Sequence, residues 1–162
     1  MHSRRNVLSM MGTVAGAALT VRLVQADAAF AAGKFEVTRT EAQWRTMLGP
    51  DRFAVLRQEA TEPAGSSPLN HEKRRGTFVC AGCDLALFNS ATKFDSGTGW
   101  PSFYAPIRGA LGSNVDRSLG MVRTEVHCRR CGGHQGHVFD DGPPPTGKRY
   151  CINGLALKFN PT

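Results

Sequence analysis

Five cysteines are the residues of this 162-residue chain with the clearest capacity for chemistry. Four of them form two C-x-x-C pairs, Cys80 with Cys83 and Cys128 with Cys131. The fifth, Cys151, has no partner at this spacing. An odd number of cysteines would leave one thiol over in any set of disulfides. The spacing therefore predicts two separate uses, four cysteines as ligands of a metal and one as a reactive thiol.

The four paired cysteines favour a structural zinc site. Four thiolates fill the tetrahedral coordination shell of Zn²⁺ and leave no position open for water or substrate. Each pair follows a predicted strand, so one Zn²⁺ per chain would join two hairpins that are distant in the sequence, and its binding energy would contribute to folding. Two disulfides, or a redox-active dithiol, are alternatives that the spacing leaves open.

Cys151 could act as a nucleophile because charged and polar residues lie near it. Arg149 and Asn153 are two positions away on either side and share its face of a predicted strand. A nearby cation lowers the pKa of a thiol and favours the thiolate. His134 and His137 lie on a glycine-rich turn and could donate a proton to an oxygen that gains charge. A small buried residue without a chemical role is the alternative for a lone cysteine in a strand.

Trp100 lies in a glycine-flanked stretch, residues 93–103, that could complete such a site. The proline at position 101 disfavours a helical conformation at Trp100, so we expect a turn or an extended segment here. The face of an indole ring can receive a polarisable methyl-sulfur group. An aromatic side chain buried under a loop is the alternative interpretation.

The elements that position these residues are predicted to be mainly β-strands. Eighteen glycines and nine prolines, with an apolar period of two after Gly76, favour short strands joined by turns. Before them, Thr40 and Gln43 fit a capping box, Gly49-Pro50 ends a first helical segment, and a second segment follows. The expected strands are 77–79, 85–88, 120–127, 136–139, 149–152 and 155–159.

The N-terminal residues, 1–31, resemble an export signal. Residues Ser3 to Leu8, with Arg4-Arg5, form a twin-arginine pattern, and a weakly apolar run from Met10 to Val21 follows it. This run is too short to span a membrane, and cleavage is expected near 28–31. The mature protein would then be a single periplasmic domain, residues 32–162, without a membrane span. An ordinary amphipathic start is the alternative.

The net charge of +7 is spread along the chain and indicates a solvated surface rather than a nucleic-acid interface. Taken singly, the motifs are also compatible with two other functions. A zinc-ribbon module for nucleic acid or protein would explain the four paired cysteines. A cysteine hydrolase would use Cys151 with His137 and Asp141.

The motifs together, in this order, resemble those of the B-type methionine-R-sulfoxide reductases. The resemblance runs from about Glu41 to Phe159 and is carried by the segments 80–83, 93–103, 128–141 and 149–153. It implies two small antiparallel sheets, short N-terminal helices packed against them, and a zinc site opposite the active site. It also implies a monomer that acts on oxidised proteins or peptides and binds no nucleic acid.

The resemblance further implies a role for each residue of the site. Cys151 would attack the sulfur of the sulfoxide and be left as a sulfenic acid. His134 and His137 would bind and protonate the sulfoxide oxygen. Trp100, with Phe139, would receive the methyl group. The remaining residues of the implied site, which would position water, the thiol and its neighbours, are Asp141, Arg149 and Asn153.

Thr98 marks a departure from many members of the family. They have a second, resolving cysteine at this place, whereas this chain has no cysteine to spare beyond the four implied zinc ligands and Cys151. The sequence resembles the one-cysteine subclass. Its sulfenic acid would have to be reduced from outside, by a thioredoxin-like protein or by a small thiol such as glutathione.

Overall fold

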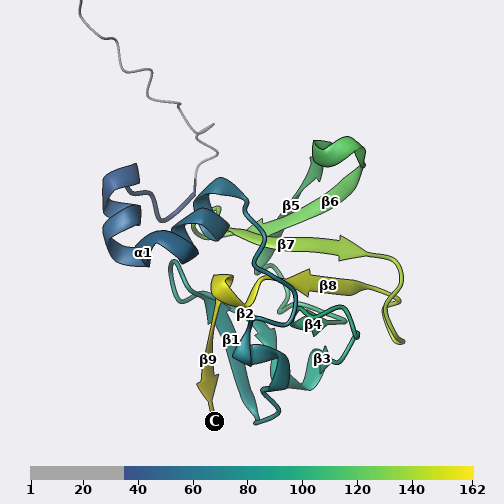
Figure 1. Ribbon diagram of the computed structural model, residues 1–162. Coiled ribbons are helices and arrows are strands. Elements are labelled where there is room, and N and C mark those ends of the chain that lie inside the picture. The colour runs from purple at the N-terminus through teal and green to yellow at the C-terminus, as the bar shows by residue number, and fades with distance from the viewer. Residues whose placement is uncertain (1–34) are drawn as a thin grey trace, which may run out of the picture. The chain divides into compact units, whose positions relative to one another are not determined.

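The computed structural model describes residues 35–162 (Figure 1), and within them it contains one α-helix and two antiparallel β-sheets. The three-stranded sheet has the order β2–β1–β9, and the six-stranded sheet has the order β3–β4–β8–β7–β6–β5. The predicted mainly-β fold with two antiparallel sheets is confirmed. The expected export signal at 1–31 lies outside the described residues. No helix within 35–162 is both long and apolar enough to cross a bilayer.

The described residues form nine strands: β1 (Gly76–Cys80), β2 (Ala86–Asn89), β3 (Lys93–Phe94), β4 (Ser102–Phe103), β5 (Leu111–Asp116), β6 (Arg123–Cys128), β7 (His134–Phe139), β8 (Arg149–Ile152) and β9 (Leu157–Pro161). The described residues also form four short 3-10 helices: η1 (Pro68–His71), between α1 and β1, and η2 (Ser90–Thr92), η3 (Ser118–Gly120) and η4 (Gly154–Ala156), between strands.

The helix α1 (Glu41–Gln58) contains both predicted helical segments. Thr40 Oγ1 accepts a hydrogen bond from Gln43 N (3.2 Å), and Gln43 Oε1 accepts one from Thr40 N (2.9 Å), so the capping box is confirmed. Gly49 has a non-helical backbone (φ 71°, ψ 174°), which breaks the helix just before Pro50. The break accommodates the proline, because its missing N–H and its ring are tolerated at the start of a helical turn.

Six of the nine strands lie where the apolar pattern predicts them, whereas β3, β4 and β5 were not predicted. Strand β5 contains Gly112, Ser113 and Asn114, which have low strand propensity and show no apolar alternation. The strand expected at 120–127 begins only at Arg123, because Gly120 ends η3 and residues 121–122 have no regular structure. Strand β5, which was not predicted, ends at Asp116, a residue that contacts His137.

Aromatic packing fixes the site strands on the core. The ring of Phe103 on β4 stacks on Phe88 at a centroid distance of 4.2 Å and meets Phe78 edge-on at 4.9 Å. All three side chains are fully buried, as is Ile152 on β8. Aromatic pairs at these distances add directional contacts to the burial of apolar surface. The two short strands β4 and β8 are therefore anchored from the face opposite to the site.

A bulge between β6 and β7 decides which way the histidines face. Val126 pairs with Gly136, but the next residue, His127, pairs with His134, so Gln135 is an extra residue on β7. In a regular strand, side chains three positions apart point to opposite faces. The extra residue brings His134 and His137 to the same face, with ring centroids 5.5 Å apart.

Candidate active site and metal centre

A small pocket of about 130 Å³ lies on the face of the large sheet that carries Cys151. The pocket is lined by Thr61, Trp100, Arg123, Gly136, His137, Phe139, Cys151 and Asn153. Five of these eight residues belong to the site predicted from the sequence. Of the other three predicted residues, His134 contacts His137 and Arg149 contacts Phe139 from outside the pocket, and Asp141 binds Arg149.

Strand pairing sets the position of Cys151. Cys151 on β8 lies opposite His137 on β7 and, on its other side, opposite Ser102 on β4. Directly opposed side chains in antiparallel strands have Cβ atoms about 4.5–5.5 Å apart. The thiol and the His137 imidazole are therefore held within reach of one small ligand atom.

Gly136 allows the two strands to approach each other at this point. Its φ of +153° lies in the region that favours glycine, and a Cβ atom at this position would lie 2.0 Å from the carbonyl oxygen of Cys151. Any side chain at position 136 would therefore push β8 away from β7.

Arg149 connects the thiol to the charged rim of the pocket. Its guanidinium lies 4.5 Å from the centre of the Phe139 ring and donates two hydrogen bonds to Asp141, at 2.9 and 2.8 Å. The Asp141 side chain is 61 % exposed, and it meets Arg149 rather than the pocket. Asp141 therefore acts on the site through Arg149.

Burial raises the pKa of the Cys151 thiol above its ordinary value of 9.0. A hydrogen bond with Thr98 and the positive charge of Arg149 both act in the opposite direction, but they do not outweigh the burial. The expectation that Arg149 lowers the thiol pKa is correct for that one interaction and wrong for the net result. The resting residue at neutral pH is a thiol that carries its proton.

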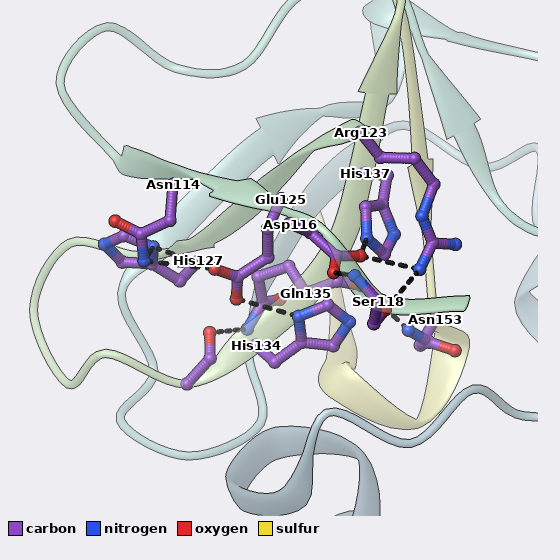
Figure 2. Close-up of polar contacts among 11 residues, drawn as sticks. Asn114, Asp116, Ser118, Arg123, Glu125, His127, His134, Gln135, His137 and Asn153 are labelled. Atoms are coloured by element: carbon purple, nitrogen blue, oxygen red, sulfur yellow. Dashed lines mark hydrogen bonds and ion pairs between the residues drawn. The ribbon is translucent and has the colours of Figure 1, made fainter. Parts of the chain in front are cut away.

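His134 is fixed by a buried carboxylate. Its Nδ1 lies 2.8 Å from Glu125 Oε1, and the second carboxylate oxygen accepts a hydrogen bond from Asn114 Nδ2 at 3.1 Å (Figure 2). Although burial acts to raise it, hydrogen bonds from His127, His134 and Asn114 hold the pKa of Glu125 well below its usual range. An ionised Glu125 binds Nδ1–H of His134 and directs Nε2 away from itself.

His137 is held in the same way by Asp116, at the end of β5. Its Nε2 lies 2.8 Å from Asp116 Oδ2, which also accepts a 2.6 Å hydrogen bond from Arg123 (Figure 2). Burial lowers the pKa of His137, as do the charges of Arg123 and His134, although Asp116 acts to raise it. In the neutral ring, Nε2–H donates to Asp116 and Nδ1 is left as an acceptor.

Trp100 and Asn153 are positioned by one segment of the irregular loop after α1. The indole Nε1 of Trp100 donates to the carbonyl oxygen of Glu62 (3.0 Å), and Glu62 N donates to Asn153 Oδ1 (3.0 Å). The Glu62 carboxylate accepts hydrogen bonds from the backbone N–H groups of Gly154 and Leu155. Glu62 therefore ties the loop to the turn that follows Cys151.

The four paired cysteines form a second cluster, at the ends of β1 and β6. The Sγ atoms of Cys80 and Cys131 are 3.7 Å apart, those of Cys83 and Cys128 are 3.5 Å apart, and all four lie within 4.8 Å of one another. These distances far exceed the disulfide length of about 2.05 Å, so neither pair is bridged. They match the roughly 3.8 Å edge of a tetrahedron of thiolates around a metal at about 2.3 Å. The cluster could hold a metal ion and join the two sheets.

The comparisons with known proteins agree with these two sites. A family model described as the SelR domain matches residues 48–161. The chain belongs to the SelR family. Similar proteins include those named "Peptide methionine sulfoxide reductase MsrB" from Pseudomonas putida strain W619 and from Bradyrhizobium diazoefficiens. The first is 54 % identical over 127 residues and the second 55 % over 130; each match covers 78 % of this chain, and 96 % and 91 % of the two relatives.

A protein of the same name from Leptospira interrogans is 50 % identical over 126 residues, which cover 77 % of this chain and 96 % of the relative. The resemblance to the B-type reductases is thereby confirmed, and the chain is an oxidoreductase of this family.

In this SelR domain, Thr98 is a direct neighbour of the reactive thiol. Its Oγ1 lies 3.9 Å from Cys151 Sγ and 2.8 Å from the hydroxyl of Ser96, which in turn contacts Ser102 at 2.7 Å. A hydroxyl cannot form a disulfide with an oxidised cysteine. The remaining cysteines lie together in the metal cluster, so no thiol among the described residues adjoins Cys151.

Sequence reasoning did not find Glu62, Asp116 or Glu125, which hold Trp100, His137 and His134. Each is a single carboxylate without a motif of its own. Asp116 and Glu125 would have become candidates only with β5 and β6 correctly paired, since Asn114 opposes Glu125 and Asp116 opposes Arg123 in that register.

Removal of one thiolate tests the metal cluster. We expect Cys83→Ser to lose bound metal, measured by plasma mass spectrometry, and to unfold in urea with a free energy lowered by roughly 2–4 kcal/mol, because the cluster joins the ends of β1 and β6. The matched control is Cys151→Ser, which should keep both metal and stability. A metal-replete and stable Cys83→Ser protein would contradict this assignment.

Alkylation of Cys151 by iodoacetamide tests the electrostatics of the thiol. Only the thiolate reacts, so the rate should still be rising with pH at pH 9, because the folded pKa lies above 9.0. Arg149→Met removes a charge that lowers this pKa and should slow alkylation several-fold at pH 8. Lys148→Met, which removes a neighbouring cation paired with Asp140, is the control. A rate that is level above pH 7, or equal in the two variants, would refute the assignment.

Proposed function

We propose that this protein reduces the R epimer of methionine sulfoxide, in peptides and proteins, to methionine. The observation that carries the proposal is the register that sets Cys151 opposite His137 in a pocket walled by Trp100 and Phe139. A sulfoxide needs a nucleophile at sulfur, a proton for the departing oxygen and an apolar surface for the methyl group. The pocket offers one group for each need.

The charge states in the pocket support a reaction that needs no outside proton. Cys151 rests as a thiol, because burial raises its pKa, and His137 rests as a neutral imidazole, because burial lowers its pKa. Nδ1 of His137 accepts the thiol proton as the sulfoxide binds, and the thiolate attacks sulfur. The imidazolium returns the proton to the oxygen. The sulfur–oxygen bond of the sulfoxide then breaks, the hydroxyl passes to Cys151 Sγ, and the bond between the two sulfurs breaks as methionine leaves. The balance is thiol plus sulfoxide to sulfenic acid plus thioether, with cysteine sulfur oxidised and methionine sulfur reduced.

Asp116 and Glu125 are the positioning residues of this scheme. The Asp116 carboxylate stabilises the imidazolium that forms at His137 and holds its ring in place through Nε2. Glu125 does the same for His134, whose buried Nε2 makes no hydrogen bond among the described residues. In the protonated ring that nitrogen carries a hydrogen and could donate it to the sulfoxide oxygen. The preference for one epimer follows from the fixed order of thiol, imidazoles and indole around the sulfur atom.

The sulfenic acid on Cys151 is returned to the thiol by an external reductant. A first reductant thiol displaces water and forms a mixed disulfide, and a second thiol releases Cys151 and leaves as part of a disulfide. Thr98, at 3.9 Å from Cys151, stands where an internal thiol would have to lie. A thioredoxin-like protein or a small thiol is the reductant class.

We propose zinc as the metal of the four-cysteine cluster, one ion per chain with a structural role. The donor set of four thiolates at tetrahedral spacing suits Zn²⁺ and leaves no open coordination position. Arg57 donates to the carbonyl oxygen of Cys131 (2.9 Å), and Arg130 donates to that of Cys83 (3.2 Å). These guanidinium groups offset the excess negative charge of four thiolates around a divalent ion.

Residues 1–31 lead to a further part of the proposal, export through the twin-arginine route to the periplasm. That route carries folded proteins, so the metal would be bound before export and the thiolates would be protected from oxidants there. The mature monomer would begin near residue 32.

Turnover of separated epimers tests the function. With dithiothreitol in excess, we expect N-acetyl-methionine-R-sulfoxide amide to be reduced and the S epimer to be reduced at least 100-fold more slowly, and Cys151→Ser to be inactive with both. Asp116→Asn should lower kcat more than it changes KM, because it acts on the imidazolium. Reduction of the S epimer at a comparable rate, or activity of Cys151→Ser, would refute the proposal.

A further inference from the structure

Gln135, the extra residue of the bulge between β6 and β7, is a polar side chain at a fully buried position. Its neighbour His134 contacts Glu125 and His137, whereas the side chain of Gln135 reaches the metal cluster at Cys80. Burying an unpaired polar atom costs free energy. The partners of this amide therefore indicate what it does.

The amide nitrogen of Gln135 has two acceptors. Nε2 donates to the carbonyl oxygen of Gly133 at 3.0 Å and lies 3.7 Å from Cys80 Sγ. The carbonyl oxygen of Gly133 fixes the orientation of the amide, because only the nitrogen end can donate to it. The second N–H of the same group is then directed to the sulfur atom of Cys80.

The sulfur atom of Cys80 becomes a strong acceptor when the cluster holds a metal. A cysteine that binds a metal is deprotonated, and hydrogen bonds to a charged acceptor are roughly twice as strong as those between neutral groups. Cys80 is fully buried, and its Sγ also accepts a hydrogen bond from the backbone N–H of Gly82 at 3.4 Å. Two N–H groups therefore stabilise the negative charge of this thiolate.

The oxygen of the Gln135 amide makes a role in packing alone unfavourable. Oε1 is buried and has no hydrogen-bond partner among the described residues. A methionine or a leucine would fill a similar space without the cost of an unpaired oxygen. The hydrogen bond from Nε2 to the Cys80 thiolate offsets that cost only when the thiolate is present.

The main chain of Gln135 contacts the catalytic pocket. Its carbonyl oxygen accepts hydrogen bonds from N (2.8 Å) and Nδ2 (3.2 Å) of Asn153, a residue that lines the pocket (Figure 2). One residue thus binds the metal cluster through its side chain and the pocket through its main chain.

We propose that Gln135 donates a hydrogen bond to the metal-bound thiolate of Cys80 and thereby joins the metal cluster to the catalytic pocket. Gln135 is a positioning residue, because it acts through Cys80 on one side and through Asn153 on the other. This inference rests on the proposed metal of the cluster and on the proposed function of the pocket. The coupling is reciprocal, so loss of the amide weakens metal binding and loosens the hydrogen bonds of Asn153.

Replacement of the amide tests this proposal. Gln135→Met and Gln135→Leu remove the N–H groups and keep a side chain of similar size. Leu87→Met, at another fully buried position, is the control for packing. Each protein is loaded with Co²⁺ for absorption spectroscopy and with Zn²⁺ for competition with a chromogenic chelator. Hydrogen exchange at the backbone N–H of Asn153 is followed by NMR in the zinc-loaded proteins.

We expect both Gln135 variants to move the sulfur-to-cobalt charge-transfer band to longer wavelength, because a thiolate with one hydrogen bond fewer gives up an electron more readily. The dissociation constant for Zn²⁺ should rise about tenfold, since residues that support metal ligands have effects of this size. Exchange at Asn153 N–H should become several-fold faster. Leu87→Met should match the wild type in all three measurements.

The hydrogen bond can also be detected without a substitution. In the wild-type protein loaded with ¹¹³Cd²⁺, we expect a scalar coupling between the metal and one side-chain amide proton of Gln135, transmitted through Cys80 Sγ. This measurement depends neither on turnover nor on the stability of a variant.

Other outcomes would overturn the proposal. These are the absence of the cadmium coupling, spectra and zinc affinities in both Gln135 variants equal to those of the wild type, and zinc loss with unchanged exchange at Asn153. A change in only one of the two variants, or an equal change in Leu87→Met, would assign the effect to packing. A wild-type protein that bound no metal would refute the proposed metal and this inference together. One that bound metal and showed the coupling, but reduced no sulfoxide, would refute the proposed function and confirm the hydrogen bond to Cys80.

Discussion

The close pairing of β7 with β8 is the constraint on which the rest of the site depends. Gly136 permits the approach, because any Cβ there would meet the Cys151 carbonyl oxygen at 2.0 Å, and this approach sets Cys151 opposite His137. The bulge at Gln135 then returns His134 to the same face. The thiol of Cys151 and the imidazole of His137 meet at one small pocket, with the imidazole of His134 beside that of His137, because of one glycine and one extra residue in a strand.

The charge states of the site residues are set by burial and by two neighbouring carboxylates. The sheet buries Cys151 and His137 enough to keep both neutral, while the carboxylates of Asp116 and Glu125 remain ionised beside the imidazoles. A neutral thiol next to a neutral imidazole is stable until a substrate arrives that can take the proton. The same arrangement protects a cysteine without a neighbouring thiol from oxidation at rest, since the thiolate is the form that oxidants attack.

Much of this molecule could be predicted from its sequence because motifs with fixed spacing encode it. The two C-x-x-C pairs predicted the metal cluster, and apolar alternation predicted six strands, among them the strand of Cys151. Strand β5 escaped prediction because its glycine, serine and asparagine carry no such alternation. Because β5 was not predicted, Asp116 was not recognised as a residue of the site. The direction in which the pKa of Cys151 shifts could not be predicted. Burial of the thiol raises this pKa more than the charge of Arg149 lowers it, and the degree of burial is not apparent from the sequence.

The central claim is that Cys151 alone carries the oxidation and has no internal partner. Single turnover of the reduced protein with the R sulfoxide, followed by intact-mass analysis with a dimedone trap, tests it most directly, with Thr98→Cys and Thr98→Val run in parallel. We predict one methionine and one trap adduct on Cys151 per chain for the wild type and for Thr98→Val. Thr98→Cys should yield methionine without adduct and a mass lower by about 2 Da, because a thiol at this position would lie close to Cys151 Sγ. A disulfide involving Cys151 in the wild type would contradict the account.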